Sequence, residues 1–134
     1  MYVACVVVLL GCDGNRREAS ALVGAVDRYR AADNDHKTAY YEALVSVPCS
    51  DAQVCSAKIA CVKVAEPTAK ALRLQREVAT DLGRIASGAL GKEAPEARAL
   101  PAKLAESDAL LAAGEAALGD CAEKATALRV RYGF

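Results

Sequence analysis

The chain has few of the residues on which β-strands depend. It contains no tryptophan, one phenylalanine and five tyrosines in 134 residues, and its glycines and prolines number only 9 and 4. About thirty positions are alanine, which has the highest helix propensity, whereas strands are enriched in aromatic and β-branched side chains. The composition therefore predicts an all-α protein.

An excess of charge of one sign is also missing. The 17 Lys and Arg residues balance the 17 Asp and Glu residues, so no overall field would attract nucleic acid. The longest apolar run covers about ten residues, whereas a helix needs roughly 20 to span a bilayer. We therefore expect neither a nucleic-acid partner nor a transmembrane helix in this chain of one-domain length.

Motifs of familiar catalytic sites are absent as well. The sequence has no G-x-S-x-G, no glycine-rich phosphate loop and no H-E-x-x-H. Its acidic residues are scattered along polar helix faces instead of being paired. We expect no enzymatic activity, no metal centre and no cofactor.

The amino terminus carries the most specific motif. Residues 2–10 are almost wholly apolar and lead into Leu9-Leu10-Gly11-Cys12. This pattern resembles the lipobox of bacterial lipoprotein signal peptides, in which a leucine stands three positions before a cysteine and a small residue directly precedes it. The resemblance implies that Cys12 is lipidated and that residues 1–11 are removed. It places the protein in the bacterial cell envelope, anchored to a membrane by its lipid, on the periplasmic or outer face.

The sequence on either side of Cys12 bears on this interpretation. No Lys or Arg precedes the short apolar run, so we expect the basic start of the leader upstream of Met1. After Cys12 the chain becomes polar at once, which predicts a linker at 12–15 followed by one domain at 16–134. The alternative is that residues 2–10 form the start of an ordinary buried strand or helix.

The first part of the domain has the pattern of one long helix. Asn15 and Glu18 form a capping box that predicts a helix start near Arg16, and Pro48 predicts its end. Between them, apolar or aromatic residues recur at three- and four-residue steps. This face comprises Leu22, Val26, Tyr29, His36, Tyr40, Leu44 and Val47.

Two further helices complete the predicted fold. A second capping box at 50–53 begins a helix that runs to about Leu90 and is kinked or broken near Pro67. A third helix restarts near Pro95 or Pro101 and continues to the end of the chain. Its apolar face comprises Leu104, Ser107, Leu111, Gly114, Leu118, Cys121, Ala125, Leu128 and Tyr132. Short connections between three helices predict an antiparallel three-helix bundle.

The cysteines predict how the bundle is stabilised, because a core made largely of alanine buries little apolar area. Loss of Cys5 with the leader and lipidation of Cys12 leave four cysteines, and an even number in an exported chain predicts two disulfides. Metal or redox chemistry is the alternative for these thiols. Zinc sites favour C-x₂₋₄-C spacing and thioredoxin-like sites need C-x-x-C, and neither spacing occurs here.

Helix geometry selects the pairing of the remaining four. Cys55 and Cys61 would be separated by about 9 Å along one helix, and Cys49 and Cys61 by about 16 Å. Bridged Cα atoms lie only about 4.4–6.8 Å apart. The pairs Cys49–Cys55 and Cys61–Cys121 remain, and equal helix lengths on either side of the turn near 89–94 place the second pair at one level.

Three residues are candidates for a ligand or contact site. His36, the only histidine, falls on the apolar face of the first helix beside Tyr40, where it could serve a ligand or simply form a hydrogen bond at the bundle edge. Tyr41 would point outward and could mark a contact surface.

Taken together, these patterns favour a non-enzymatic, lipid-anchored envelope protein that acts as a protein-interaction or structural module, with an unknown protein partner. The alternative is a periplasmic carrier of a small ligand or metal, with a cavity near His36 and Tyr40.

Overall fold

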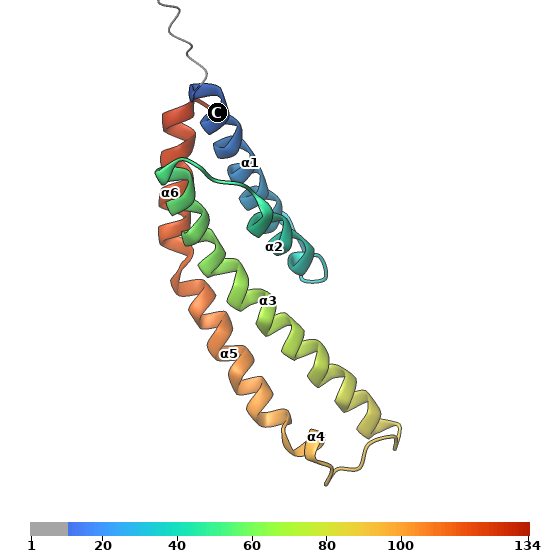
Figure 1. Cartoon of the computed structure of the whole chain (residues 1–134). Helices are drawn as coiled ribbons and strands as arrows, with labels where there is room; N and C mark the ends of the chain where they lie inside the picture. Colours follow the sequence, from blue (N-terminus) through green and yellow to red (C-terminus); the bar gives the residue numbers. More distant parts are fainter. Residues whose placement is uncertain (1–10) are drawn as a thin grey trace, which may run out of the picture.

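The computed structural model describes residues 11–134, and all regular structure in this range is helical. The helices are α1 (Gly11–Ala31), α2 (Lys37–Ser46), α3 (Ala52–Ala86), α4 (Pro95–Arg98), α5 (Leu100–Ala116) and α6 (Leu118–Tyr132). In Figure 1, α5 and α6 return beside α3, while α1 and α2 lie against only one end of it. The predicted all-α class is confirmed, but the predicted set of three long helices is not.

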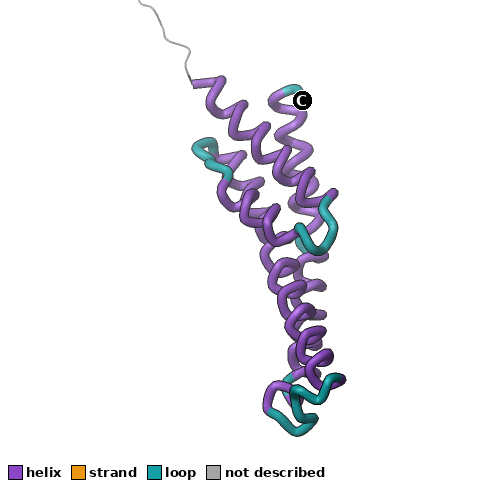
Figure 2. The backbone as a smooth tube through the Cα atoms, turned by 90° about the vertical axis from the view of Figure 1, so that its right-hand side faces the viewer, coloured by secondary structure: helices purple, strands orange, loops and turns teal. Residues whose placement is uncertain are grey.

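The molecule has two regions of different thickness. The head consists of residues 11–66, which include α1, α2 and the start of α3, together with α6. The stalk consists of residues 67–116, which include the rest of α3, α4 and α5. Figure 2 shows the head as several packed helices and the far end of the stalk as a hairpin of two. The long dimension therefore comes from α3, whose 35 residues correspond to about 52 Å of helix.

The main apolar cluster lies in the head. Its larger buried side chains come from four helices and the α2–α3 connector. The apolar surface that they bury holds these helices together. They are Leu22, Val23, Val26, Tyr29, Leu44, Val47, Val54, Cys61, Val64, Cys121 and Leu128. In the stalk, the buried positions include Ala71, Leu72, Val78, Leu100 and Ser107, so each level of the hairpin buries little area.

The single helix predicted for residues 16–47 is wrong. The chain turns at 32–36, between α1 and α2, and the two helices pack against each other. Asp33 Oδ1 accepts hydrogen bonds from the backbone N–H and the ring Nδ1 of His36, at 3.0 and 2.6 Å. Asp and Asn side chains compete with the helical backbone in this way, and Asp33-Asn34-Asp35 supplies three of them in a row.

The start of the domain also differs from expectation. Helix α1 begins at Gly11, so residues 12–15, predicted as a linker, are helical. Glu18 does not close a capping box: its carboxylate accepts from the Ser50 backbone N–H and hydroxyl at 2.6 and 2.9 Å. Residues 1–10 of the predicted leader and the side chain of Cys12 lie outside the described part of the protein, and their fate stays a prediction.

Helix α3 passes through Pro67 without a break, so of the two alternatives predicted there, a kink or a break, the break is wrong. Its N-cap is Asp51 instead of Ser50, because Asp51 Oδ1 accepts from the N–H groups of Gln53 and Val54 at 3.0 and 3.2 Å. The helix ends at Ala86, and Gly88 follows with a φ of 79°, a left-handed conformation that suits glycine.

The returning helix is nearly continuous, as predicted, but is interrupted twice. Ala99 separates α4 from α5, and Ala117 separates α5 from α6. At the second interruption, the Ala117 N–H bonds to the Gly114 carbonyl three residues back, at 3.2 Å, which tightens the turn. Gly114 and Gly119 flank this point, and glycine has a low helix propensity.

Gly114 also lets α5 approach α3 closely beside Pro67. A Cβ atom at this position would lie 2.7 Å from Thr68 Oγ1 and 3.0 Å from the Val64 carbonyl oxygen. Any larger residue would push the two helices apart. The two helices of the hairpin thus approach each other closely at the junction of head and stalk.

Candidate functional site

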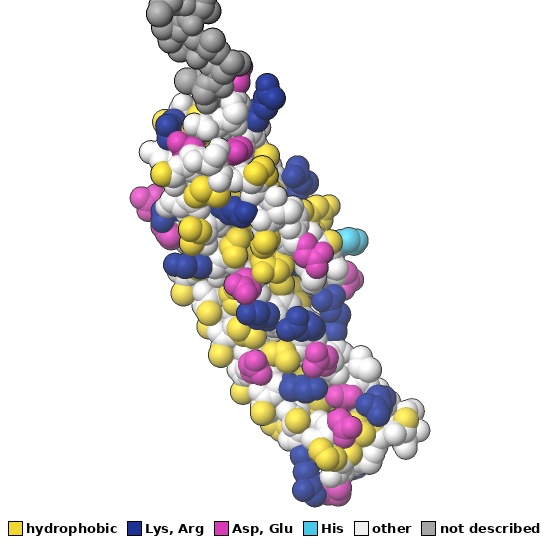
Figure 3. Space-filling model, in the orientation of Figure 1, with side chains coloured by type: hydrophobic (Ala, Val, Ile, Leu, Met, Phe, Trp, Pro, Cys, Tyr) yellow, Lys and Arg dark blue, Asp and Glu magenta, His cyan; other side chains and the backbone are white. Residues whose placement is uncertain are grey.

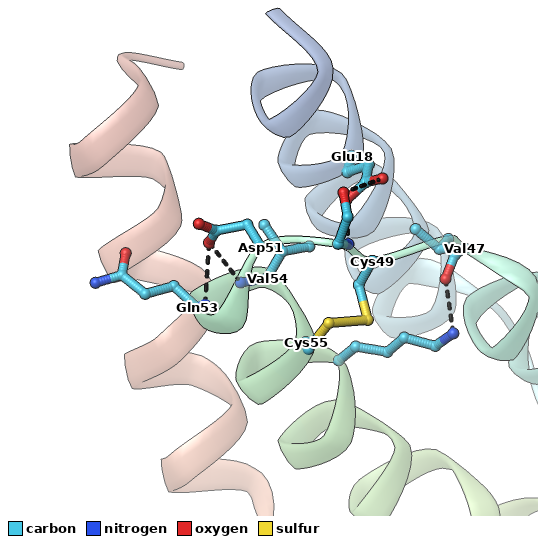
Figure 4. The surroundings of a disulfide bond; sticks show 9 residues. Glu18, Val47, Cys49, Asp51, Gln53, Val54 and Cys55 are labelled. Atoms are coloured by element: carbon cyan, nitrogen blue, oxygen red, sulfur yellow. Dashed lines mark hydrogen bonds between the residues drawn. A yellow bond between two sulfur atoms is a disulfide. The ribbon is translucent and has the colours of Figure 1, made fainter. Parts of the chain in front are cut away.

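The two disulfides are confirmed with the predicted pairing, and both lie in the head. Cys49 and Cys55 have Cα atoms 5.2 Å apart, and Cys61 and Cys121 have theirs 4.6 Å apart. Figure 4 shows how the first bond fixes the connector between α2 and α3. Lys58 Nζ adds a hydrogen bond to the Val47 carbonyl at 2.6 Å. These cysteines therefore hold the fold together as structural bonds.

The predicted candidate residues do not share a cavity. The His36 side chain is 68% exposed and pairs with Asp33, which lowers the pKa of the Asp33 carboxyl below its usual value. Tyr40 and Tyr41 are both half-buried against the head core, so Tyr41 is not the outward-pointing ring that the sequence predicted. The hypothesis of a ligand site between His36 and Tyr40 loses its geometric basis.

A different hollow lies where α1 ends against the hairpin. It has a volume of about 460 Å³, within the range of roughly 300–1,000 Å³ that is typical of small-molecule sites. We call it the α1-end groove. Its lining residues come from α1, α2, α3, α5 and α6: Tyr29, Arg30, Lys37, Val64, Thr68, Leu111, Gly114, Glu115 and Leu118.

Tyr29 and Lys37 form one wall of the groove. Lys37 Nζ lies 4.6 Å from the centre of the Tyr29 ring and donates a hydrogen bond to the Tyr29 carbonyl at 3.0 Å. Burial raises the pKa of the Tyr29 phenol, and the neighbouring Thr68 hydroxyl acts in the opposite direction. The two hydroxyls do not reach hydrogen-bonding geometry, however, so Tyr29 Oη is buried without a partner within residues 13–134.

The two flanks of the stalk differ in chemistry. On one flank, Lys103 Nζ lies 3.3 Å from Glu77 and 3.6 Å from Asp81, and Asp81 also pairs with Arg84 at 3.1 Å. These ion pairs tie α3 to α5 and leave this flank polar. We call it the ion-pair flank.

The opposite flank carries two exposed leucines. Leu104 stands seven residues before Leu111 on α5, and Leu82 stands fourteen after Thr68 on α3, so both continue the helix faces that line the α1-end groove. Leu82 is 52% exposed and Leu104 is 45% exposed. We call the side with these two leucines the leucine flank. The face of the stalk that Figure 3 draws carries Lys, Arg, Asp and Glu side chains among hydrophobic ones.

Neither a metal site nor a membrane span is evident in the region that the structure covers. In residues 11–134, no three His, Cys, Asp or Glu side chains come together as metal ligands. No helix in the same range combines the length and apolarity needed to cross a bilayer. Comparison of the chain with protein-family models, curated proteins and solved structures gives no match.

Sequence reasoning missed the α1-end groove for a physical reason. The groove exists because α1 stops at Ala31 and the chain reverses, which brings Lys37 back over Tyr29. A helix continued through this point would have carried Lys37 away from Tyr29. The signal that could have revealed it is the Asp33-Asn34-Asp35 turn.

Proposed function

We propose that this chain is a non-enzymatic, lipid-anchored protein of the bacterial envelope whose stalk binds a protein partner. The observation that carries the proposal is the leucine flank, where the side chains of Leu82 and Leu104 are about half exposed to solvent. Exposed leucines that share one flank of a hairpin offer apolar contact area to a partner. The ion-pair flank, with its charges already paired inside the chain, offers no such surface.

The position of the stalk relative to the proposed anchor fits this role. Helix α1 begins at Gly11, next to Cys12, so a lipid on Cys12 would hold the head directly at the bilayer. In Figure 1, the far end of the stalk lies at the opposite end of the molecule from the start of α1. The leucine flank would thus meet its partner several tens of ångströms from the membrane.

The disulfides support the proposed location. Both bonds close within the head, and disulfides persist in oxidising compartments such as the bacterial periplasm. Two such bonds in a chain of this size agree with export, as the lipobox resemblance implies.

The anchor is tested by fractionation. The Cys12→Ala variant should leave the membrane fraction and become extractable with salt-free buffer, while a Cys5→Ala control should remain membrane-bound. A Cys12→Ala protein that still fractionates with membranes would contradict the anchor.

The partner surface is tested by site-specific photo-crosslinking in the cells that make the protein. A photoreactive residue at Leu82 or Leu104 should yield one common adduct with another protein. The control position is Ala109, which is exposed on α5 but lies on another face. Equal adducts from position 109, or none from the two leucine positions, would overturn the proposed interaction.

A further inference from the structure

We infer that the α1-end groove binds a small amphipathic anion, namely a carboxylate with an alkyl body. The inference is independent of the lipid anchor and of the partner proposed for the stalk. It rests on three features of the groove: its apolar lining, its unpaired basic side chains and its unsatisfied buried hydroxyl.

The apolar lining suits an alkyl body. Val64, Leu111 and Leu118 come from three different helices and meet around the groove, and Leu118 is 41% exposed there. Gly114 lies among them and packs directly against α3. Small-molecule sites are concave and mostly apolar, with a few polar groups that fix orientation, and this groove has that composition.

Two basic side chains at the groove lack an acidic partner. No carboxylate within residues 13–134 lies within ion-pairing distance of Lys37 or Arg30. The Lys37 ammonium carries three N–H donors and uses one on the Tyr29 carbonyl. Glu115 is the one acid among the lining residues. Two bases against one acid favour a ligand with a single negative charge, whose head group lies near Lys37 and Arg30.

The Tyr29 hydroxyl is a second, independent sign of a missing polar group. Tyr29 is only 6% exposed, and within residues 13–134 its Oη has no hydrogen-bond partner. Thr68, its neighbour, donates its own hydrogen bond to the Val64 carbonyl at 2.8 Å. Buried hydroxyls are normally satisfied. Lys37 covers the ring of Tyr29, so a ligand that draws the flexible lysine side chain toward its carboxylate would open a path for an oxygen to reach Tyr29 Oη.

The experiment is a titration of the full chain, carrying Cys12→Ala so that no attached lipid competes, with dodecanoate below its micelle concentration. Calorimetry should show saturable binding of one equivalent. Dodecanol, which has the same chain length and no charge, should bind at least tenfold more weakly. Equal binding of the two probes would overturn the role of Lys37 and Arg30.

Variants separate a specific site from general adsorption. Lys37→Gln and Leu118→Ser should each weaken dodecanoate binding at least tenfold, with unchanged melting temperatures as the check on folding. The matched control is Lys70→Gln on α3, because Lys70 pairs with Glu66 and lies outside the groove. An equal loss in Lys70→Gln, or no loss in Lys37→Gln, would overturn the site.

Discussion

The head and the stalk are built from the same alanine-rich sequence but are stabilised in different ways. In the head, four helices enclose leucine, valine and tyrosine side chains, and both disulfides lie there. In the stalk, two helices meet through small residues, with the Ser107 hydroxyl donating to the Ala71 carbonyl at 3.3 Å, and through the ion pairs of Lys103. Alanine thus favours helices in both regions, whereas the larger buried side chains and the covalent bonds are concentrated in the head.

The largest expected effect separates the two disulfides. Removing Cys61–Cys121 with a double alanine variant should lower the free energy of unfolding by about 4 kcal/mol, because this bond closes a loop of 60 residues. Removing Cys49–Cys55 in the same way should cost about 2 kcal/mol, since its loop has only 6. Urea unfolding of the two double variants measures both, and equal losses would contradict the loop-length explanation.

A smaller effect is expected where the head meets the stalk. Gly114→Ala would place a Cβ atom against Thr68 and the α3 backbone, and should destabilise the protein by about 1–3 kcal/mol through overpacking. The matched control is Gly83→Ala in the stalk, where no atom lies within 4 Å of the new Cβ. That change should stabilise α3 by about 0.5–1 kcal/mol. Thermal and urea unfolding should therefore shift in opposite directions, and shifts of the same sign would show that the close approach at Gly114 is not limiting.

The ion-pair flank should contribute less than the packing at Gly114. Lys103→Met removes both contacts across the stalk, to Glu77 and to Asp81, but Asp81 keeps its pair with Arg84. We expect a loss of about 0.5–1 kcal/mol that shrinks in high salt. Urea unfolding at low and high salt measures it. A salt-independent loss would mean that the lysine stem, and not its charge, holds α5 to α3.

The smallest effect concerns the turn between α1 and α2. The pKa of Asp33 is lowered by its bond to His36, so its stabilising contribution is present above the ordinary carboxyl pKa and is lost as the pH falls through the lowered value. Asp33→Ala should therefore reduce the melting temperature slightly at neutral pH, and the difference from the unchanged protein should vanish in acid. A difference that persists in acid would contradict this explanation.

Periodicity and chemistry predicted a large part of this fold from the sequence. The face of the last predicted helix correctly included Ser107, Gly114 and Cys121, which are buried, although Leu104 and Leu118 of the same face are exposed. Helix geometry selected the correct disulfides. These predictions succeeded because they depend on spacing along one helix or on a distance limit between bonded atoms.

Other features depend on how distant parts of the chain meet, and these were missed. The apolar spacing from Tyr29 through His36 to Tyr40 continued across the turn at 32–36, so periodicity alone gave one helix where there are two. The α1-end groove and the leucine flank arise because α1 and α2 cover only one end of α3. The local sequences of α3 and α5 do not determine how far along them the other helices pack.

The Cys61–Cys121 bond also determines how the protein would carry a mechanical load. Every residue of the stalk lies between these two cysteines. Tension applied between the two ends of the chain would pass through α1, α2 and the start of α3, cross the sulfur–sulfur bond and leave through α6. The stalk would bear none of this tension. Stretching would therefore extend the head first, while the leucine flank stays folded and keeps its protein partner bound.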